Sequence, residues 1–97
     1  AAADLLPVRR DFAFVLDDAV AAGDVVKAAQ NADKAQIAAV AVFDVFHGGS
    51  LGRAKKSLGL EVTIQPRDRT LTDQEIEAVA RKVIAEVKRV TGGEVRG

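Results

Sequence analysis

Residues 40–65 read VAVFDVFHGGSLGRAKKSLGLEVTIQ, and this stretch decides the fold. It predicts two β-strands, at residues 40–46 and 56–65, joined by a glycine-rich turn, because glycine adopts positive φ at little cost. Along the second strand every other residue is apolar: Leu58, Leu60, Val62 and Ile64. This alternation is typical of a strand with one face on a core and the other face open. The stretch therefore predicts an antiparallel hairpin that is buried on one side.

The first strand of this hairpin carries an unusual set of side chains. Phe43 and Val45 share one face by parity, and we expect that face to join the core. Asp44 and Phe46 then lie on the opposite face, which leaves a carboxylate and an aromatic ring in solvent. This pair is the best candidate for a functional site in the chain.

Two amphipathic helices flank the hairpin. One is expected at residues 22–32, with Asp24 favourably placed in its first turn. The other begins after Thr72, which forms a capping box with Glu75, three residues further on. Apolar residues recur along this second helix at helical spacing, at Ile76, Val79, Ala80, Val83, Val87 and Val90. Two glycines at 92 and 93 end it.

Strands at residues 11–16 and 94–96 complete the order β-α-β-β-α-β. In the first of them Phe12, Phe14 and Leu16 occupy alternate positions, and the two phenylalanines are expected in the core. This order predicts the α+β, ferredoxin-like split βαβ fold, in which a four-stranded antiparallel sheet carries both helices on one face. The opposite face of the sheet is left open.

Length and composition fit one modest domain. The chain has 97 residues, and 48% of them are apolar, so it is expected to fold rather than stay disordered. It lacks cysteine, which excludes disulfides, thiolate metal sites and a cysteine nucleophile and favours a cytosolic origin. No apolar run approaches the ~20 residues of a membrane span, so no membrane partner is expected. The length predicts a single domain over residues 1–97, and the absence of methionine, even at the start, predicts that this domain is cut from a longer protein.

The open face has the composition of a surface that binds single-stranded RNA. Parity places on it Ala13, Val15, Asp44, Phe46, Ser57, Gly59 and Glu61. The basic residues expected around its rim are Arg9, Arg10, Arg53, Lys55 and Lys56. An exposed ring stacks on a base, and a neighbouring carboxylate accepts from the N1–H and N2 amino group of guanine. A basic rim holds phosphates and makes binding sensitive to salt.

Other interpretations of the same residues stay open. An exposed phenylalanine also packs under neighbouring domains, so the open face is alternatively the docking surface of a structural domain. Asp44 is alternatively a solvated residue, and the basic residues a solvated cluster. His47 has no second histidine and no cysteine with which to share a metal ion. Ligand sensing or hydrolysis would need a closed pocket with paired carboxylates, and the sequence contains no catalytic constellation.

Four segments resemble the ferredoxin-fold anticodon-binding domain at the C-terminus of the phenylalanyl-tRNA synthetase β subunit. They are PVRRDFAFV at 7–15, VFDVF at 42–46, GRAKKSL at 52–58 and DRTLTD at 68–73, in the order and spacing of that family. The resemblance runs over nearly the whole chain, and the bacterial-type β subunit is the most similar version.

The resemblance implies an anticodon-binding module that carries no catalytic residue. In the family, the aspartate at the position of Asp44 hydrogen-bonds the first anticodon base, guanine, and an aromatic at the position of Phe46 stacks on it. The positions of Ala13 and Ser57 lie on the same surface. The family usually has tyrosine where this chain has Phe46, so stacking is expected to persist without the hydroxyl.

The resemblance also implies a parent enzyme and its partners. That enzyme attaches phenylalanine to its tRNA with ATP and magnesium, as a cytoplasmic (αβ)₂ assembly with the chemistry in the α subunit. The domain itself is expected to need no cofactor and no metal. Phosphate contacts are assigned from charge and placement alone to Arg10, Arg53, Lys55 and Lys56.

Overall fold

The computed structural model describes residues 5–48, 52 and 54–96, and its elements follow the predicted order. They are β1 (Val8–Asp17), α1 (Ala22–Asn31), β2 (Ile37–His47), β3 (Lys55–Ile64), α2 (Asp73–Thr91) and β4 (Glu94–Val95). Strands β1 and β2 extend beyond their predicted limits at both ends, because their antiparallel ladders with β3 continue from Val8 to Asp17 and from Ile37 to His47.

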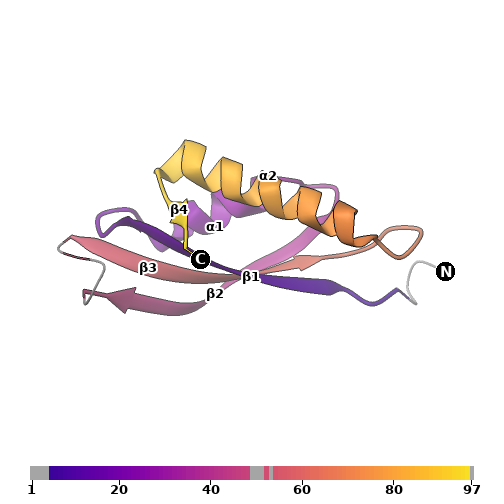
Figure 1. Cartoon of the computed structure of the whole chain (residues 1–97), viewed down its shortest axis with the longest axis horizontal. Coiled ribbons are helices and arrows are strands. Elements are labelled where there is room, and N and C mark those ends of the chain that lie inside the picture. Colours follow the sequence, from indigo (N-terminus) through magenta and orange to yellow (C-terminus); the bar gives the residue numbers. More distant parts are fainter. Residues whose placement is uncertain (1–4, 49–51, 53, 97) are drawn as a thin grey trace.

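The sheet has the order β2-β3-β1-β4, and every neighbouring pair is antiparallel. Strand β3 therefore lies between β1 and β2, which is the split βαβ arrangement. Both helices cover the same face of the sheet, and no element of the described residues covers the other face (Figure 1). The predicted ferredoxin-like fold is confirmed.

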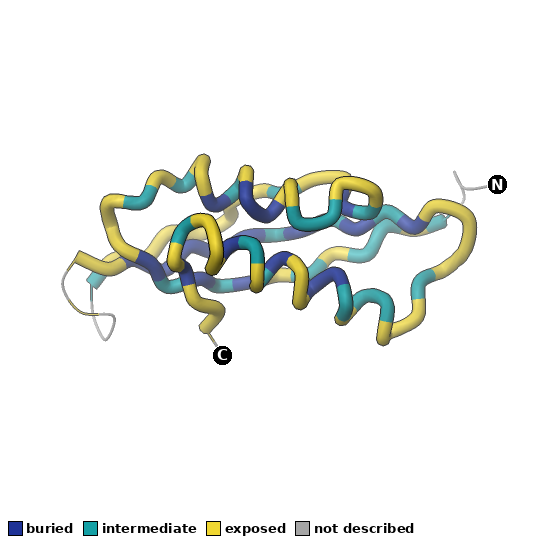
Figure 2. The backbone as a smooth tube through the Cα atoms, turned by 90° about the horizontal axis from the view of Figure 1, so that it is seen from above, coloured by how far each residue is buried: buried dark blue, intermediate teal, exposed yellow. Residues whose placement is uncertain are grey.

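The core lies between the helices and the covered face of the sheet. Alternate residues of β1 and β3 enter it, because successive side chains of a strand point to opposite faces. Buried positions recur along both helices and both central strands (Figure 2). The core residues are Phe12, Phe14, Leu16, Val25, Ala28, Ala29, Ile37, Leu58, Leu60, Val62, Ile64, Val79, Ala80, Val83 and Val87. Val90, predicted on the apolar stripe of α2, is instead 49% exposed, because the helix has passed the end of the core there.

The predicted capping box at the start of α2 is present. The Thr72 hydroxyl accepts from the Glu75 backbone N–H at 3.2 Å, and the Glu75 carboxylate accepts from the Thr72 N–H at 2.9 Å. Arg69 adds a two-pronged contact to the same carboxylate, at 2.8 and 2.6 Å. At the other end Gly92 adopts a φ of 77°, and its N–H donates to the Lys88 carbonyl. These caps set the limits of α2.

The cap predicts a pH dependence of stability. Hydrogen bonds from Arg69, and then from the Thr72 backbone, lower the pKa of Glu75 from 4.5 to about 2. Because folding depresses this pKa, ionised Glu75 stabilises the fold above pH 4.5 and loses that effect as the pH falls toward 2. We expect Glu75→Gln to be less stable than the parent in urea denaturation above pH 4.5, with the difference shrinking below it. A difference that does not vary with pH would contradict this role.

Candidate nucleic-acid interface

The open face of the sheet is organised in rows across three strands. One row joins Ala13 of β1, Gly59 of β3 and Asp44 of β2, and the next row places Ser57 opposite Phe46. Because these residues alternate with the core positions of the same strands, they point away from the helices. The sheet thus brings Ala13, Asp44, Phe46 and Ser57 to one surface, as predicted.

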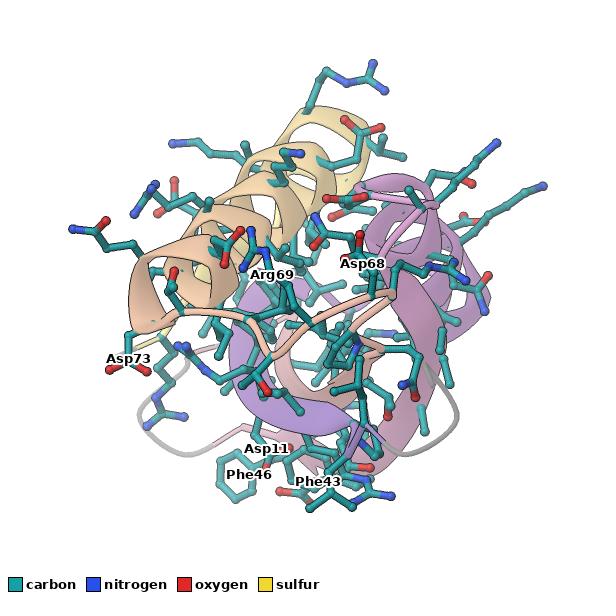
Figure 3. All side chains as sticks on the ribbon, turned by 90° about the vertical axis from the view of Figure 1, so that its right-hand side faces the viewer. Asp11, Phe43, Phe46, Asp68, Arg69 and Asp73 are labelled. Atoms are coloured by element: carbon teal, nitrogen blue, oxygen red, sulfur yellow. The ribbon has the colours of Figure 1, made fainter. Side chains whose placement is uncertain are left out.

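Phe46 and Asp44 are the accessible members of this set. The Phe46 side chain is on the surface, with the residue 48% exposed, and Asp44 is exposed as well. In Figure 3 the Phe46 ring lies on the side of the sheet away from the helices. Within the described residues, no hydrogen bond or ion pair reaches the Asp44 carboxylate. A ring and a carboxylate acceptor are therefore exposed to solvent in adjacent rows.

Ser57 and Ala13 offer less surface than the sequence suggested. Ser57 is only 8% exposed, because it lies on the central strand β3 between Phe46 and Val15. The Ala13 carbonyl already accepts a hydrogen bond from the Arg96 N–H at 2.7 Å. Ala13 therefore presents its methyl group to the open face, in the same row as Asp44.

Phe43 lies on the open face, and the prediction that it joins the core is wrong. The register between β2 and β3 shifts between Val42 and Asp44, so a β-bulge leaves Phe43 without a partner on β3. An ideal Cβ built on Gly59 would lie 2.9 Å from Cζ of Phe43, which places the ring over the glycine. Phe43 is 57% exposed, and Figure 3 shows it on the same side as Phe46.

Two of the predicted phosphate contacts lie on the helix side of the sheet. Arg10 shares the face of Phe12 and donates to the Glu77 carboxylate of α2 at 3.0 Å, which lowers the pKa of Glu77. Lys56 lies opposite Leu16 and is 9% exposed. The prediction that both lie on the open rim is wrong, because parity groups each of them with the core residues of its own strand.

The remaining basic residues of the predicted rim are Lys55, Arg53 and Arg9. Lys55 lies on the open-face side of β3, and its Nζ contacts the Asp17 carboxylate at 2.7 Å. Arg53 lies outside the described residues. Near the other end of the face, Arg9 approaches Glu61 at 3.8 Å. Lys55 is thus the predicted phosphate contact that the structure places on this face.

Asp11 also lies on this surface, where the sequence-based prediction did not place it. It lies opposite Glu61, one row beyond Ala13, and it is exposed (Figure 3). The sequence does contain the signal, because Asp11 and Ala13 have the same parity. Two carboxylates in this row repel phosphates, so an RNA backbone is disfavoured over this part of the face.

The described part of the chain contains neither a metal cluster nor a membrane-spanning helix. In that part, no three or more histidine or acidic side chains gather as a metal site would require. None of its helices has the length and apolar character needed to cross a membrane.

The sequence is similar to known anticodon-binding domains along almost all of its length. The sequence pattern of the family described as Ferredoxin-fold anticodon binding domain matches residues 5–96. The phenylalanine–tRNA ligase β subunit of Rhodopseudomonas palustris is 57% identical over 91 residues, 94% of this chain and 11% of that protein. The β subunits of Bradyrhizobium diazoefficiens and Paramagnetospirillum magneticum are 60% and 56% identical, over 93% and 99% of this chain.

The chain is therefore much shorter than these relatives, and it spans 11% of the length of the first two. The family pattern nonetheless covers nearly all of it and coincides with the six elements of the fold. This chain belongs to the ferredoxin-fold anticodon-binding domain family.

Proposed function

We propose that this domain binds the anticodon of a phenylalanine-accepting tRNA on the open face of its sheet. The observation that carries the proposal is the exposure of Phe46 and Asp44 in adjacent rows of an anticodon-binding domain. Phe46 stacks on the first anticodon base, a contact that contributes roughly 1–3 kcal/mol. Asp44 accepts hydrogen bonds from the N1–H and N2 amino group of guanine on its Watson–Crick edge.

The neighbouring residues give this base a place to lie. The Ala13 methyl lies low in the same row as Asp44, so a base can approach the sheet closely there. Ser57 lies opposite Phe46 on the neighbouring strand, and its hydroxyl contributes to the edge of the site. Lys55 supplies a phosphate contact after leaving Asp17, at small cost because exposed ion pairs contribute only ~0–1 kcal/mol.

The parent protein is, by this proposal, the β subunit of a phenylalanine–tRNA ligase. Its aminoacylation chemistry uses ATP and magnesium and takes place in the α subunit, within an (αβ)₂ assembly. The domain contributes tRNA recognition alone. Family membership favours this role over the alternative in which the open face docks other domains of the synthetase.

An NMR titration of the isotopically labelled chain with a tRNA anticodon stem-loop tests the proposal. A second stem-loop with adenine in place of the first anticodon guanine is the control. We expect chemical-shift changes at Ala13, Asp44, Phe46 and Ser57 that are weaker with the control RNA. Changes confined to arginines and lysines, and equal for both RNAs, would refute anticodon reading by this face.

Two adjacent lysines provide a matched test of the phosphate contact. Lys55→Gln is expected to lower the slope of log K against log salt concentration by about 0.7, without changing base preference, because it removes one contact to a single strand. Lys56→Gln is expected to leave this slope unchanged, because Lys56 lies on the helix side and is 9% exposed. Fluorescence anisotropy over a salt series measures both. Equal slopes for the two variants would contradict the assignment of Lys55.

A further inference from the structure

The bulge at Phe43, one of two register shifts between β2 and β3, gives the open face a second aromatic ring. Val42 pairs with Leu60 and Asp44 pairs with Gly59, so Phe43 is the extra residue between two ladder positions. In a regular strand Phe43 and Asp44 would point to opposite faces. Here an ideal Cβ on Gly59 would meet both of them on the open face, at 2.9 Å from the Phe43 ring and 3.2 Å from the Asp44 Cβ.

Gly59 is what allows the Phe43 ring to lie across the sheet. Its backbone does not need glycine for its conformation, because Gly59 is not among the residues with positive φ. Because glycine has no side chain, the space on the open face of this position is free, and the ring atoms Cζ and Cε1 of Phe43 occupy it. The sheet supports the ring from below, and 57% of the residue stays open to solvent.

The two open-face rings are free to accept separate partners. Within the described residues, the aromatic pair in stacking contact is Phe12 with Phe14, on the helix side. Phe43 and Phe46 are three residues apart along β2, a separation of up to ~10 Å along an extended strand. That spacing suits two bases splayed over a sheet, which is how four-stranded sheets with two aromatic residues hold single-stranded RNA.

We propose that Phe43 is a second base-stacking residue, which stacks on a nucleobase other than the one bound by Phe46 and Asp44. This inference rests on the proposed function and adds a second nucleotide to the same face. The Phe43 ring has no hydrogen-bonding group, so it holds any base by stacking and does not read its identity. Phe43 therefore supplies affinity and orders the strand, while Asp44 supplies the preference for guanine.

The test is a cycle between protein variants and abasic RNAs. Affinities of the parent chain, Phe43→Leu and Phe46→Leu are measured for stem-loops that lack one base of the loop at a time. Leucine keeps apolar volume and removes the aromatic face, so each variant is expected to bind the intact stem-loop roughly 5- to 50-fold more weakly. For each variant, we expect the loss of affinity relative to the parent to vanish with the one RNA that lacks the base stacked on the replaced ring. The missing base for Phe43→Leu differs from the missing base for Phe46→Leu.

Gly59→Ala provides an independent route to the same prediction. The added Cβ displaces the Phe43 ring, since 2.9 Å is shorter than a carbon–carbon contact allows. The same Cβ would lie 3.2 Å from the Asp44 Cβ, so we expect this variant to lose binding at the nucleotide of Phe43→Leu and also at the base bound by Asp44. Amide spectra of all variants establish that the fold is kept.

The possible results distinguish a failure of the Phe43 proposal from a failure of the proposed anticodon binding. If Phe46→Leu shows its nucleotide-specific loss while Phe43→Leu binds every RNA as the parent does, Phe43 is not a stacking residue and the domain still reads an anticodon. Phe43 is likewise not a stacking residue if the loss in Phe43→Leu is equal for all abasic RNAs, or if Phe43→Leu impairs only binding to other synthetase domains. If neither leucine variant nor Asp44→Asn alters RNA binding, the proposed function fails as well.

Discussion

Replacing Phe14 with alanine is expected to lower the free energy of unfolding by about 3–5 kcal/mol, the largest effect on stability that we predict. Phe14 has no exposed surface, and its ring lies 5.9 Å from that of Phe12 under the helices. Alanine at this position would leave a cavity on the central part of β1, where Phe14 pairs with Leu58 and Val95. A domain of this size is typically stable by only ~5–15 kcal/mol, so the loss is a large share.

Replacing the open-face Phe46 with alanine should lower the free energy of unfolding much less. Phe46→Ala removes a ring that is 48% exposed, and we expect a loss of about 1 kcal/mol or less. Urea denaturation of the two variants and the parent at neutral pH makes the comparison. Similar losses for Phe14→Ala and Phe46→Ala would mean that the open-face ring is part of the core and is not held available for a ligand.

The features that could be predicted from the sequence are those encoded by residues close together in the chain. The alternation along β3 follows from Leu58, Leu60 and neighbours at period two, and each of them is buried. The capping box follows from Thr72 and Glu75, which are three residues apart and make both expected hydrogen bonds. Such local patterns determine where an element lies, and the order of elements then leaves few possible topologies.

The bulge in β2 could not be predicted, because it depends on how two strands pair. An extra residue in a strand reverses the alternation of all residues that follow it. Nothing in the sequence of β2 marks the position of the extra residue. Counted back from Val45, parity therefore predicts Phe43 in the core, whereas the ring lies over Gly59 instead. The predicted places of Asp44 and Phe46 are confirmed, because both follow the extra residue and pair with β3 beyond the bulge.

The errors over basic residues have a different cause. Arg10 has the parity of Phe12, and Lys56 has the parity of Leu58, so alternation alone would place both on the helix side. The prediction of a basic rim gives the charge of these residues more weight than their parity. The aliphatic part of such side chains can pack against apolar surface while the charged end reaches a partner, as Arg10 reaches Glu77.

Asp44→Asn is expected to abolish most of the preference for guanine at the first anticodon position. An ionised carboxylate accepts two hydrogen bonds from N1–H and the N2 amino group, whereas an asparagine amide offers one acceptor and a misplaced donor. Hydrogen bonds to a charged group contribute about 1.5–3 kcal/mol, so affinity for the guanine stem-loop should fall roughly 10- to 100-fold. Affinity for the adenine stem-loop should change little, because adenine does not present this pair of donors.

Asp11→Asn is the matched control, because Asp11 is an exposed carboxylate on the same face, one row beyond Ala13. Both variants remove one negative charge, which slightly strengthens binding to any RNA backbone, so the charge effect cancels between them. If RNA affinity falls only for Asp44→Asn and only with the guanine stem-loop, Asp44 recognises the Watson–Crick edge of guanine. If both variants change the two affinities alike, the carboxylate acts only through its charge, and the discrimination of guanine must come from groups other than Asp44.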